Sequence, residues 1–234
     1  MKFKSFIIII CSFIFFNCSN NTNTPEFIKK VSGRYLYNSD EVIKIYFNEN
    51  ELFMEWRGAK NIKPLKVNKT TFFVKEMNEK IQFLNNPSNN KDYIVLVQKD
   101  ENIAQIFNYV KLNDNENIPS EYLKNNKFDK AIEAYLAIQK RDSLDNTINE
   151  NNFNSLGYNK LRDENYQEAI AIFKINVALY PNSANVYDSL AEAFMKSGDT
   201  LQAITNYKKS LTLDSGNSRA KKHIKKLEKQ PSKN

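Results

Sequence analysis

Cysteine and histidine, which often act as nucleophiles, bases or metal ligands, are scarce in this chain of 234 residues. Its two cysteines, Cys11 and Cys18, lie before residue 20, and its one histidine, His223, lies near the other end. A disulfide framework, a zinc site and a histidine-based triad each need more of these side chains than the body of the chain supplies. His223 stands between lysines with no second group to support proton transfer, so we expect it at the surface.

The carboxylates and serines of the chain do not form a recognisable catalytic or metal-binding pattern either. The acidic residues of Asp40–Glu41, Asp114–Glu116 and Asp163–Glu164 stand in turn-like segments, where side chains splay apart, and they lack the spacing of a calcium loop. No glycine-rich phosphate loop is present. A Ser-x-x-Lys fragment begins at Ser88, but this serine follows a proline in an asparagine-rich loop instead of opening a buried helix. We therefore expect no catalytic activity, no metal and no cofactor.

The amino-terminal residues predict export. Lys2 and Lys4 precede an apolar run, Phe6–Phe16, which as a helix spans about 16 Å, roughly half of a hydrocarbon core. This length favours a signal peptide that is removed over a permanent membrane span. An ordinary secretory peptide and an uncleaved anchor are the alternatives.

The end of this run, Phe15-Phe16-Asn17-Cys18, resembles the lipobox of bacterial lipoproteins, although that family prefers Leu at the place of Phe15 and Gly or Ala at the place of Asn17. The resemblance implies a signal peptide at residues 1–17, lipidation of Cys18, and a lipidated cysteine with a polar tether over residues 18–32. Ser19, directly after the cysteine, implies the outer membrane in that family. We expect an exported outer-membrane lipoprotein that faces the periplasm, with a membrane contact through its lipid anchor.

The formal net charge of +7 is concentrated near the carboxyl end. The segment 219–234 is strongly basic and holds one acidic residue, Glu228, whereas the rest of the chain is close to neutral once Lys2 and Lys4 leave with the signal. Basic side chains on a last helix interact favourably with the negative end of the helix dipole and keep the end of a helical array solvated. These roles account for the charge, so we expect no nucleic-acid partner. Loose attraction of this segment to anionic lipid is the alternative.

Residues 33–112 have the two-residue hydrophobic period of β-strands. Turn-like separators between short apolar runs predict an antiparallel meander that curls into a β-sandwich or open barrel. Trp56 and nearby phenylalanines either pack in the core or line a ligand pocket; at this size the core is favoured. The expected strands are Val42–Phe47, Leu52–Trp56, Thr71–Lys75, Lys80–Leu84, Tyr93–Val97 and Ile103–Val110.

The same block resembles the small β-domain that trails the catalytic domain of penicillin-binding and β-lactamase-type serine hydrolases. The resemblance rests on Ser32-Gly33-Arg34-Tyr35, Ile43–Phe47, Thr71-Phe72-Phe73 and Lys80–Phe83. None of these positions is catalytic in those relatives, so the resemblance implies an accessory part and no active site.

A polar linker at 113–118 precedes helical repeats with a capping helix over residues 119–230. Ala131, Ala169 and Ala203 are 38 and 34 residues apart, and an aromatic residue follows each alanine by four positions. This period, with Leu156-Gly157 and Pro181, resembles the tetratricopeptide repeat. Small residues would let paired helices approach closely, and we expect the partial first repeat or the β-domain to cover the open end of the array.

The tetratricopeptide resemblance implies that the first helix of each unit lines a concave groove. Asp188 and Glu192 oppose the carboxylate clamp of chaperone-binding members, so we do not predict that specificity. A groove that is merely solvated, or filled by the β-domain of the same chain, is the alternative. The expected groove residues are Asn151, Asn154, Tyr158, Leu161, Arg162, Asn185, Asp188, Glu192, Met195 and Lys196.

Together these patterns predict an α+β protein, a small antiparallel β-sandwich or open barrel followed by a short tetratricopeptide α-solenoid. The predicted function is that of a non-catalytic, lipid-anchored scaffold or adaptor of the cell envelope that binds a protein or peptide partner. The alternative is an accessory or detached non-catalytic module of a serine hydrolase.

Overall fold

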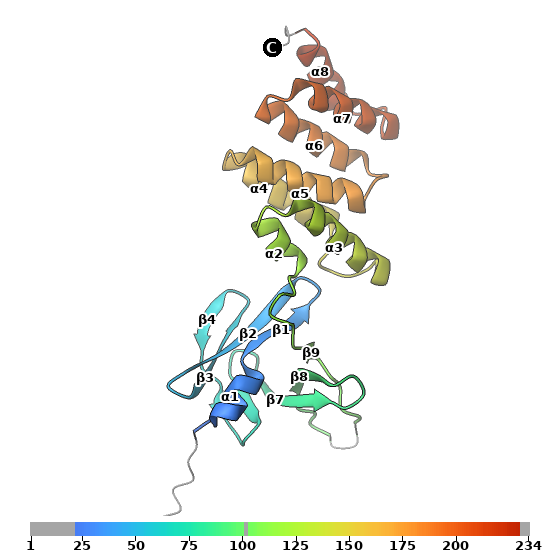
Figure 1. Ribbon diagram of the computed structural model, residues 1–234. Coiled ribbons are helices and arrows are strands. Elements are labelled where there is room, and N and C mark those ends of the chain that lie inside the picture. Colours follow the sequence, from blue (N-terminus) through green and yellow to red (C-terminus); the bar gives the residue numbers. More distant parts are fainter. Residues whose placement is uncertain (1–21, 101–102, 230–234) are drawn as a thin grey trace, which may run out of the picture.

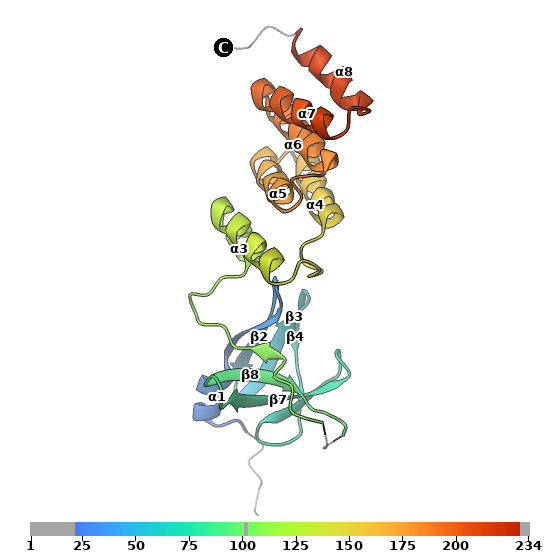
Figure 2. The same cartoon turned by 90° about the vertical axis from the view of Figure 1, so that its right-hand side faces the viewer.

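The computed structural model describes residues 22–100 and 103–229, and it has the α+β architecture that the sequence predicts. A β-domain forms one end of an elongated molecule, and successive helices stack away from it until α8 at the far end (Figure 1). The view from the side shows the same order (Figure 2). Among the described residues, none of the helices combines the length and apolar composition that crossing a membrane requires.

The β-domain consists of two antiparallel sheets in which neighbouring strands follow one another along the chain. The sheets meet where Tyr35 of the first forms a bridge with Lys111, next to the last strand of the second, and they are not closed into a barrel. The first sheet contains β1 (Gly33–Asn38), β2 (Glu41–Asn48), β3 (Glu51–Trp56) and β4 (Ala59–Ile62). The second contains β5 (Leu65–Lys66), β6 (Thr71–Val74), β7 (Glu79–Asn86), β8 (Lys91–Leu96) and β9 (Tyr109–Val110).

Alternate side chains of these strands fill the core between the sheets. Ile43 and Ile45 of β2 are buried, and Ile45 lies opposite Met54 of β3, which is also buried. Because strand side chains alternate between faces, this register confirms the inward faces that the period-two pattern predicts. Trp56 lies at the edge of the same core, with its ring 5.6 Å from that of Tyr37.

A helix that the sequence analysis did not predict covers this core. Helix α1 (Pro25–Val31) lies inside the segment expected to be a polar tether, and its Phe27 ring lies 5.8 Å from that of Phe83. Thr24 caps the helix by accepting a hydrogen bond from the Phe27 amide, and proline occupies the first turn. The polar segment therefore ends before Pro25. In the second sheet, the strand expected over Ile103–Val110 is restricted to β9.

The other described helices form three successive pairs followed by a single last helix, and the first helix of the first pair is short. That helix has 6 residues because Pro119 fixes where it begins, as the sequence predicts. The helices are α2 (Pro119–Lys124), α3 (Phe128–Arg141), α4 (Glu150–Arg162), α5 (Tyr166–Leu179), α6 (Ala184–Ser197), α7 (Thr200–Leu213) and α8 (Ser218–Leu227).

Small residues allow the paired helices to approach closely. A Cβ atom built on Gly157 of α4 would lie 2.5 Å from the Phe173 ring of α5, a separation that real side chains do not tolerate. Ala191 of α6 is fully buried at the position equivalent to Gly157, and Ala169 of α5 and Ala203 of α7 are fully buried on the second helices of the two pairs. The last helix, α8, covers the end of the array with Ala220, Ile224 and Leu227 turned inward, which confirms its expected role as a cap.

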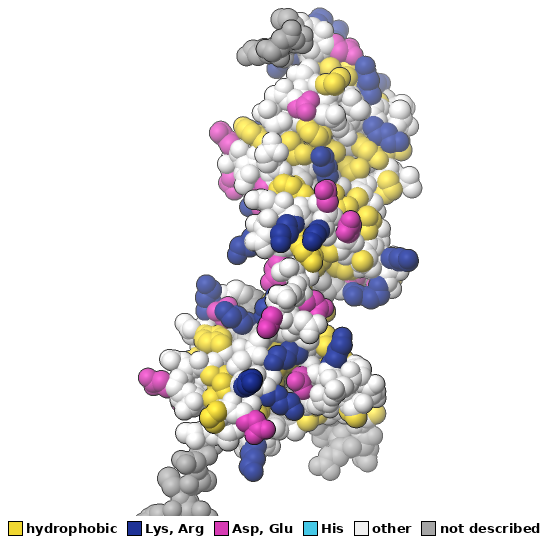
Figure 3. Space-filling model, in the orientation of Figure 1, with side chains coloured by type: hydrophobic (Ala, Val, Ile, Leu, Met, Phe, Trp, Pro, Cys, Tyr) yellow, Lys and Arg dark blue, Asp and Glu magenta, His cyan; other side chains and the backbone are white. Residues whose placement is uncertain are grey.

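The hairpin turn between β1 and β2 joins the β-domain to the first helical unit. The Asp40 carboxylate accepts hydrogen bonds from the Ser120 amide at 2.6 Å and from the Tyr135 hydroxyl at 2.6 Å. Arg34 of β1 forms an ion pair with Glu121 of α2 at 2.7 Å. The space-filling surface narrows between the two parts (Figure 3). The first unit and this hairpin therefore cover the open end of the array.

Candidate binding face

Helices α4 and α6 are the first helices of successive pairs, and their caps fix where each begins and ends. The Asn149 side chain caps α4 by accepting from the Asn152 amide. Gly198 ends α6 at φ 91°, a left-handed conformation that suits glycine. Polar side chains recur on each helix at intervals of three to four residues, so they share one face. We call Asn151, Asn154, Tyr158 and Arg162 of α4, with Asn185, Asp188, Glu192 and Lys196 of α6, the polar face.

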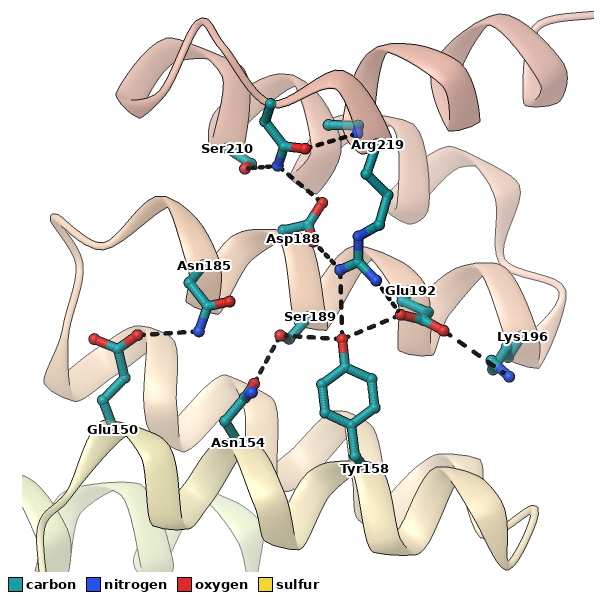
Figure 4. Close-up of polar contacts among 12 residues, drawn as sticks. Glu150, Asn154, Tyr158, Asn185, Asp188, Ser189, Glu192, Lys196, Ser210 and Arg219 are labelled. Carbon is teal, nitrogen blue, oxygen red and sulfur yellow. Dashed lines mark hydrogen bonds and ion pairs between the residues drawn. The ribbon is translucent and has the colours of Figure 1, made fainter.

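The centre of the polar face is a hydrogen-bond network that spans three helices (Figure 4). The Tyr158 hydroxyl of α4 donates to Glu192 of α6 at 3.1 Å, and Arg219 of α8 donates to the same carboxylate at 2.7 Å. Arg219 also pairs with Asp188, whose side chain is only 7% exposed. A buried carboxylate needs such a partner, because an unpaired charge in this environment is costly.

Further contacts fix the two acids and the start of each helix. Asn217 donates to the second oxygen of Asp188 at 3.1 Å, and the Ser189 hydroxyl donates to Asn154 at 2.7 Å. Toward the amino ends of α4 and α6, Asn185 donates to Glu150 at 3.1 Å. The polar face is thus ordered by its own side chains before any partner arrives.

The predicted groove residues differ in how far they are available to a partner. Asn151, Arg162, Asn185 and Lys196 are exposed, whereas Asn154, Tyr158, Glu192 and Met195 are partly buried and Asp188 is buried. Leu161 does not belong with them. Its side chain is 5% exposed and packs in the core of the array with residues of the following helices, so a bound partner would not reach it.

Sequence reasoning missed the contribution of α8. It treated this helix as a solvating cap, yet Arg219 organises the centre of the polar face. The 34-residue period of the repeats could have revealed this role of Arg219. Arg219 follows Asn185 by 34 residues, as Asn185 follows Asn151. Equivalent positions of stacked repeats lie on one surface, so α8 continues the polar face as well as capping the array.

Two aromatic groups beneath this network have shifted pKa values. Burial, and then the negative charge of Glu192, raises the pKa of Tyr207, which stays a neutral phenol. His223 stacks on the Tyr207 ring at 5.2 Å and is half-buried, so the expected surface position is only partly correct. Burial, and then the neighbouring Arg219, lowers the pKa of His223, which favours the neutral imidazole. Within residues 22–100 and 103–229, no cluster of side chains could hold a metal ion.

Comparison with known proteins identifies the repeat. Residues 184–217, which contain α6 and α7, match the tetratricopeptide repeat family model. No curated protein matches the chain. The match does not extend to the β-domain, whose resemblance to the trailing domains of serine hydrolases stays a prediction.

Solved structures that are similar to part of this chain include a tetratricopeptide domain and two further proteins. The second tetratricopeptide domain of human RPAP3, solved with an HSP70 peptide, is 20% identical, with a TM-score of 0.34, and the match covers 48% of this chain and 90% of that one. A mutant of MamA is 21% identical, with a TM-score of 0.37, over 47% of this chain and 77% of that one. The Yersinia enterocolitica secretion chaperone SycD, solved with a peptide of the translocator YopD, is 14% identical, with a TM-score of 0.33, over 47% and 86%.

Proposed function

We propose that this protein is a non-catalytic interaction protein of the cell envelope, whose polar face on α4 and α6 binds a protein or peptide. The observation that carries the proposal is the set of exposed groups at equivalent repeat positions. Asn151 and Asn185 form one such pair, and Arg162 and Lys196 form the other. Amide groups donate and accept hydrogen bonds, which suits recognition of a peptide backbone as well as of side chains.

The ordered network below these exposed groups supports binding over solvation alone. Tyr158 is held from beneath by the Phe173 ring at 5.3 Å and from above by Glu192 and Arg219. A surface that is rigid in advance loses less conformational entropy when a partner binds. The β-domain contacts the array at α2, at Tyr135 and Arg141 of α3 and at Asp145, and none of those contacts involves the polar face. This placement argues against a face filled by the chain's own β-domain.

The direct test is site-specific photo-crosslinking in cells. A photoreactive amino acid at Asn151 or at Asn185 should capture the same partner, because both side chains are exposed on the polar face. Matched controls are Lys130 and Lys140, which are exposed on α3, the second helix of its unit. Capture that is equally strong from α3, or absent from both polar-face positions, would contradict the proposal.

The second part of the proposal is the location. We propose that a lipid on Cys18 holds the protein at the outer membrane, facing the periplasm, with residues 1–17 removed. Cys18 lies outside the described residues, so the support comes from the lipobox-like sequence alone. Replacing Cys18 by Ala should move the protein from the membrane to the soluble fraction, whereas Cys11→Ala should leave it at the membrane. Unchanged fractionation of Cys18→Ala would remove the anchor from the proposal.

A further inference from the structure

Helix α8 extends the polar face with basic residues. Arg219, Lys222 and Lys226 follow Asn185, Asp188 and Glu192 by 34 residues each. On a helix, positions separated by three, four and seven residues lie on one side, so these three basic residues form a row. Arg219 forms ion pairs with Asp188 and Glu192 on α6, so this side of α8 faces the polar face. We call Arg219, Lys222 and Lys226 the basic row.

The other lysines of α8 lie on a different side of the helix. Lys221 and Lys225 line a shallow hollow at the end of the array, together with Lys208 and Leu211 of α7. The inward residues of α8, such as Ile224, also contribute to this hollow. The charge of the last helix is therefore divided between the polar face and the end of the molecule, which no count of basic residues reveals.

The acids of the polar face are already engaged within the molecule. Asp188 accepts from Asn217 and Arg219, and Glu192 accepts from Tyr158 and Arg219. A basic partner would have to break these contacts and leave Arg219 without them. In the sequence, Asp188 and Glu192 argue against an acidic ligand. In the structure they orient Arg219, so their negative charge is already balanced within the molecule.

In the part of the chain that the structure describes, the positive charges of Lys222 and Lys226 in the basic row are not balanced by acidic side chains in this way. Within the described ranges, Lys222 and Lys226 form no ion pair, whereas Lys196 of α6 lies 3.9 Å from Glu192. Burial and the positive charges of Arg219, Lys222 and Lys226 lower the pKa of His223, which stands among them on α8, while Glu192 opposes this shift. With exposed Arg162 and Lys196 on the neighbouring helices, this end of the polar face presents an excess of positive charge.

We infer that the partner of the polar face is an acidic peptide segment, whose side-chain carboxylates lie along the basic row of α8. The inference rests on the proposed binding function of α4 and α6 and names the chemistry that this face selects. Arg219 positions the row and contributes its outward edge, since its side chain is 43% exposed. The long lysine side chains supply charges that follow an acidic segment without demanding one fixed geometry.

The test uses synthetic peptides as probes. A fluorescent glutamate-rich peptide should bind the purified chain about tenfold more tightly than its glutamine counterpart at low salt, and added salt should reduce this difference. The variant Lys222→Glu/Lys226→Glu should lose the preference. The matched variant Lys221→Glu/Lys225→Glu carries the same charge change on the same helix, but it should keep the preference. Circular dichroism and thermal unfolding of both variants establish that each is folded.

Several outcomes would overturn the inference. Equal losses in the two double variants would show that charge acts diffusely over α8. Tighter binding of a lysine-rich peptide would assign the opposite chemistry. Stronger binding to phosphatidylglycerol vesicles than to the acidic peptide, lost with Lys221→Glu/Lys225→Glu, would make α8 a membrane-surface helix. If photo-crosslinking from Asn151 and Asn185 succeeds and Lys222→Glu/Lys226→Glu leaves it unchanged, the acidic partner is refuted while the binding function stands.

Discussion

Polar side chains serve different purposes in the β-domain and in the helical array. Away from its junction with the array, the β-domain has turns in which side chains bond to backbone close by, as where Asn68 accepts from the Thr71 amide and Asn86 accepts from the Ser88 amide. In the array they connect distant units, as where Tyr158 meets Arg219, 61 residues further along the chain. Hairpin turns have to satisfy their own backbone, whereas stacked repeats bring equivalent side chains together. This difference explains why the polar face arises on the array.

The largest effect should come from deleting a core ring in either region. Phe173→Ala in the array and Phe72→Ala in the β-domain should each cost about 3 to 5 kcal/mol of the unfolding free energy, because both rings are almost completely buried. Trp56 is the only tryptophan, so its fluorescence reports on the β-domain, while far-ultraviolet circular dichroism reports mainly on the helices. Phe173→Ala should lower the unfolding midpoint seen by circular dichroism more than the midpoint seen by Trp56 fluorescence. Phe72→Ala should lower the midpoint seen by Trp56 fluorescence more. Equal shifts would show that the two regions unfold as one unit.

The close helix contact at Gly157 gives a smaller effect. Gly157→Ala should destabilise the array by about 1 to 2 kcal/mol, because the clash with the enclosed Phe173 ring outweighs the higher helix propensity of alanine. Thermal unfolding followed by circular dichroism measures it. Ser155→Ala, at an exposed position of the same helix, should be neutral or slightly stabilising. A Gly157→Ala protein as stable as Ser155→Ala would refute the tight packing of α4 on α5.

The network at the centre of the polar face should contribute a comparable amount to the stability of the array. Arg219→Ala leaves buried Asp188 with Asn217 as its remaining partner and should cost about 1 to 3 kcal/mol in the stability of the array. Lys221→Ala on the same helix should change stability by less than about 0.5 kcal/mol, because its side chain is exposed. If both variants unfold alike in denaturant, Arg219 does not stabilise the face.

The smallest effect concerns pH and the junction between the regions. Burial raises the pKa of Asp40, although its hydrogen bonds with Tyr135 and Ser120 oppose the shift. The folded state therefore binds the Asp40 proton more tightly than the unfolded state, so stability should rise as pH falls from the raised folded value toward the unfolded value of about 3.9. Asp40→Asn removes this titration. The unfolding free energy of wild type minus that of Asp40→Asn should increase on acidification, and a flat difference would contradict it.

Much of the fold could be predicted because hydrophobic periodicity is a local property. The inward faces of β2 and β3, the helix pairs, and the cap built on Ala220, Ile224 and Leu227 all follow from side chains within a few positions of one another. Helix α1 also had local signals in Thr24 and Pro25, but a short segment in polar surroundings needs the core beneath it to be stable.

The sequence by itself determined the class of most elements, the period of the repeats and the small number of cysteine and histidine side chains. Only the tertiary structure decided which polar residues meet. Arg219 neutralises Asp188, Asp40 joins the β-domain to Tyr135, and Leu161 turns into the core. The physical reason is that an ion pair or hydrogen bond between distant residues depends on the relative position of whole elements, and this position is set by how their cores pack.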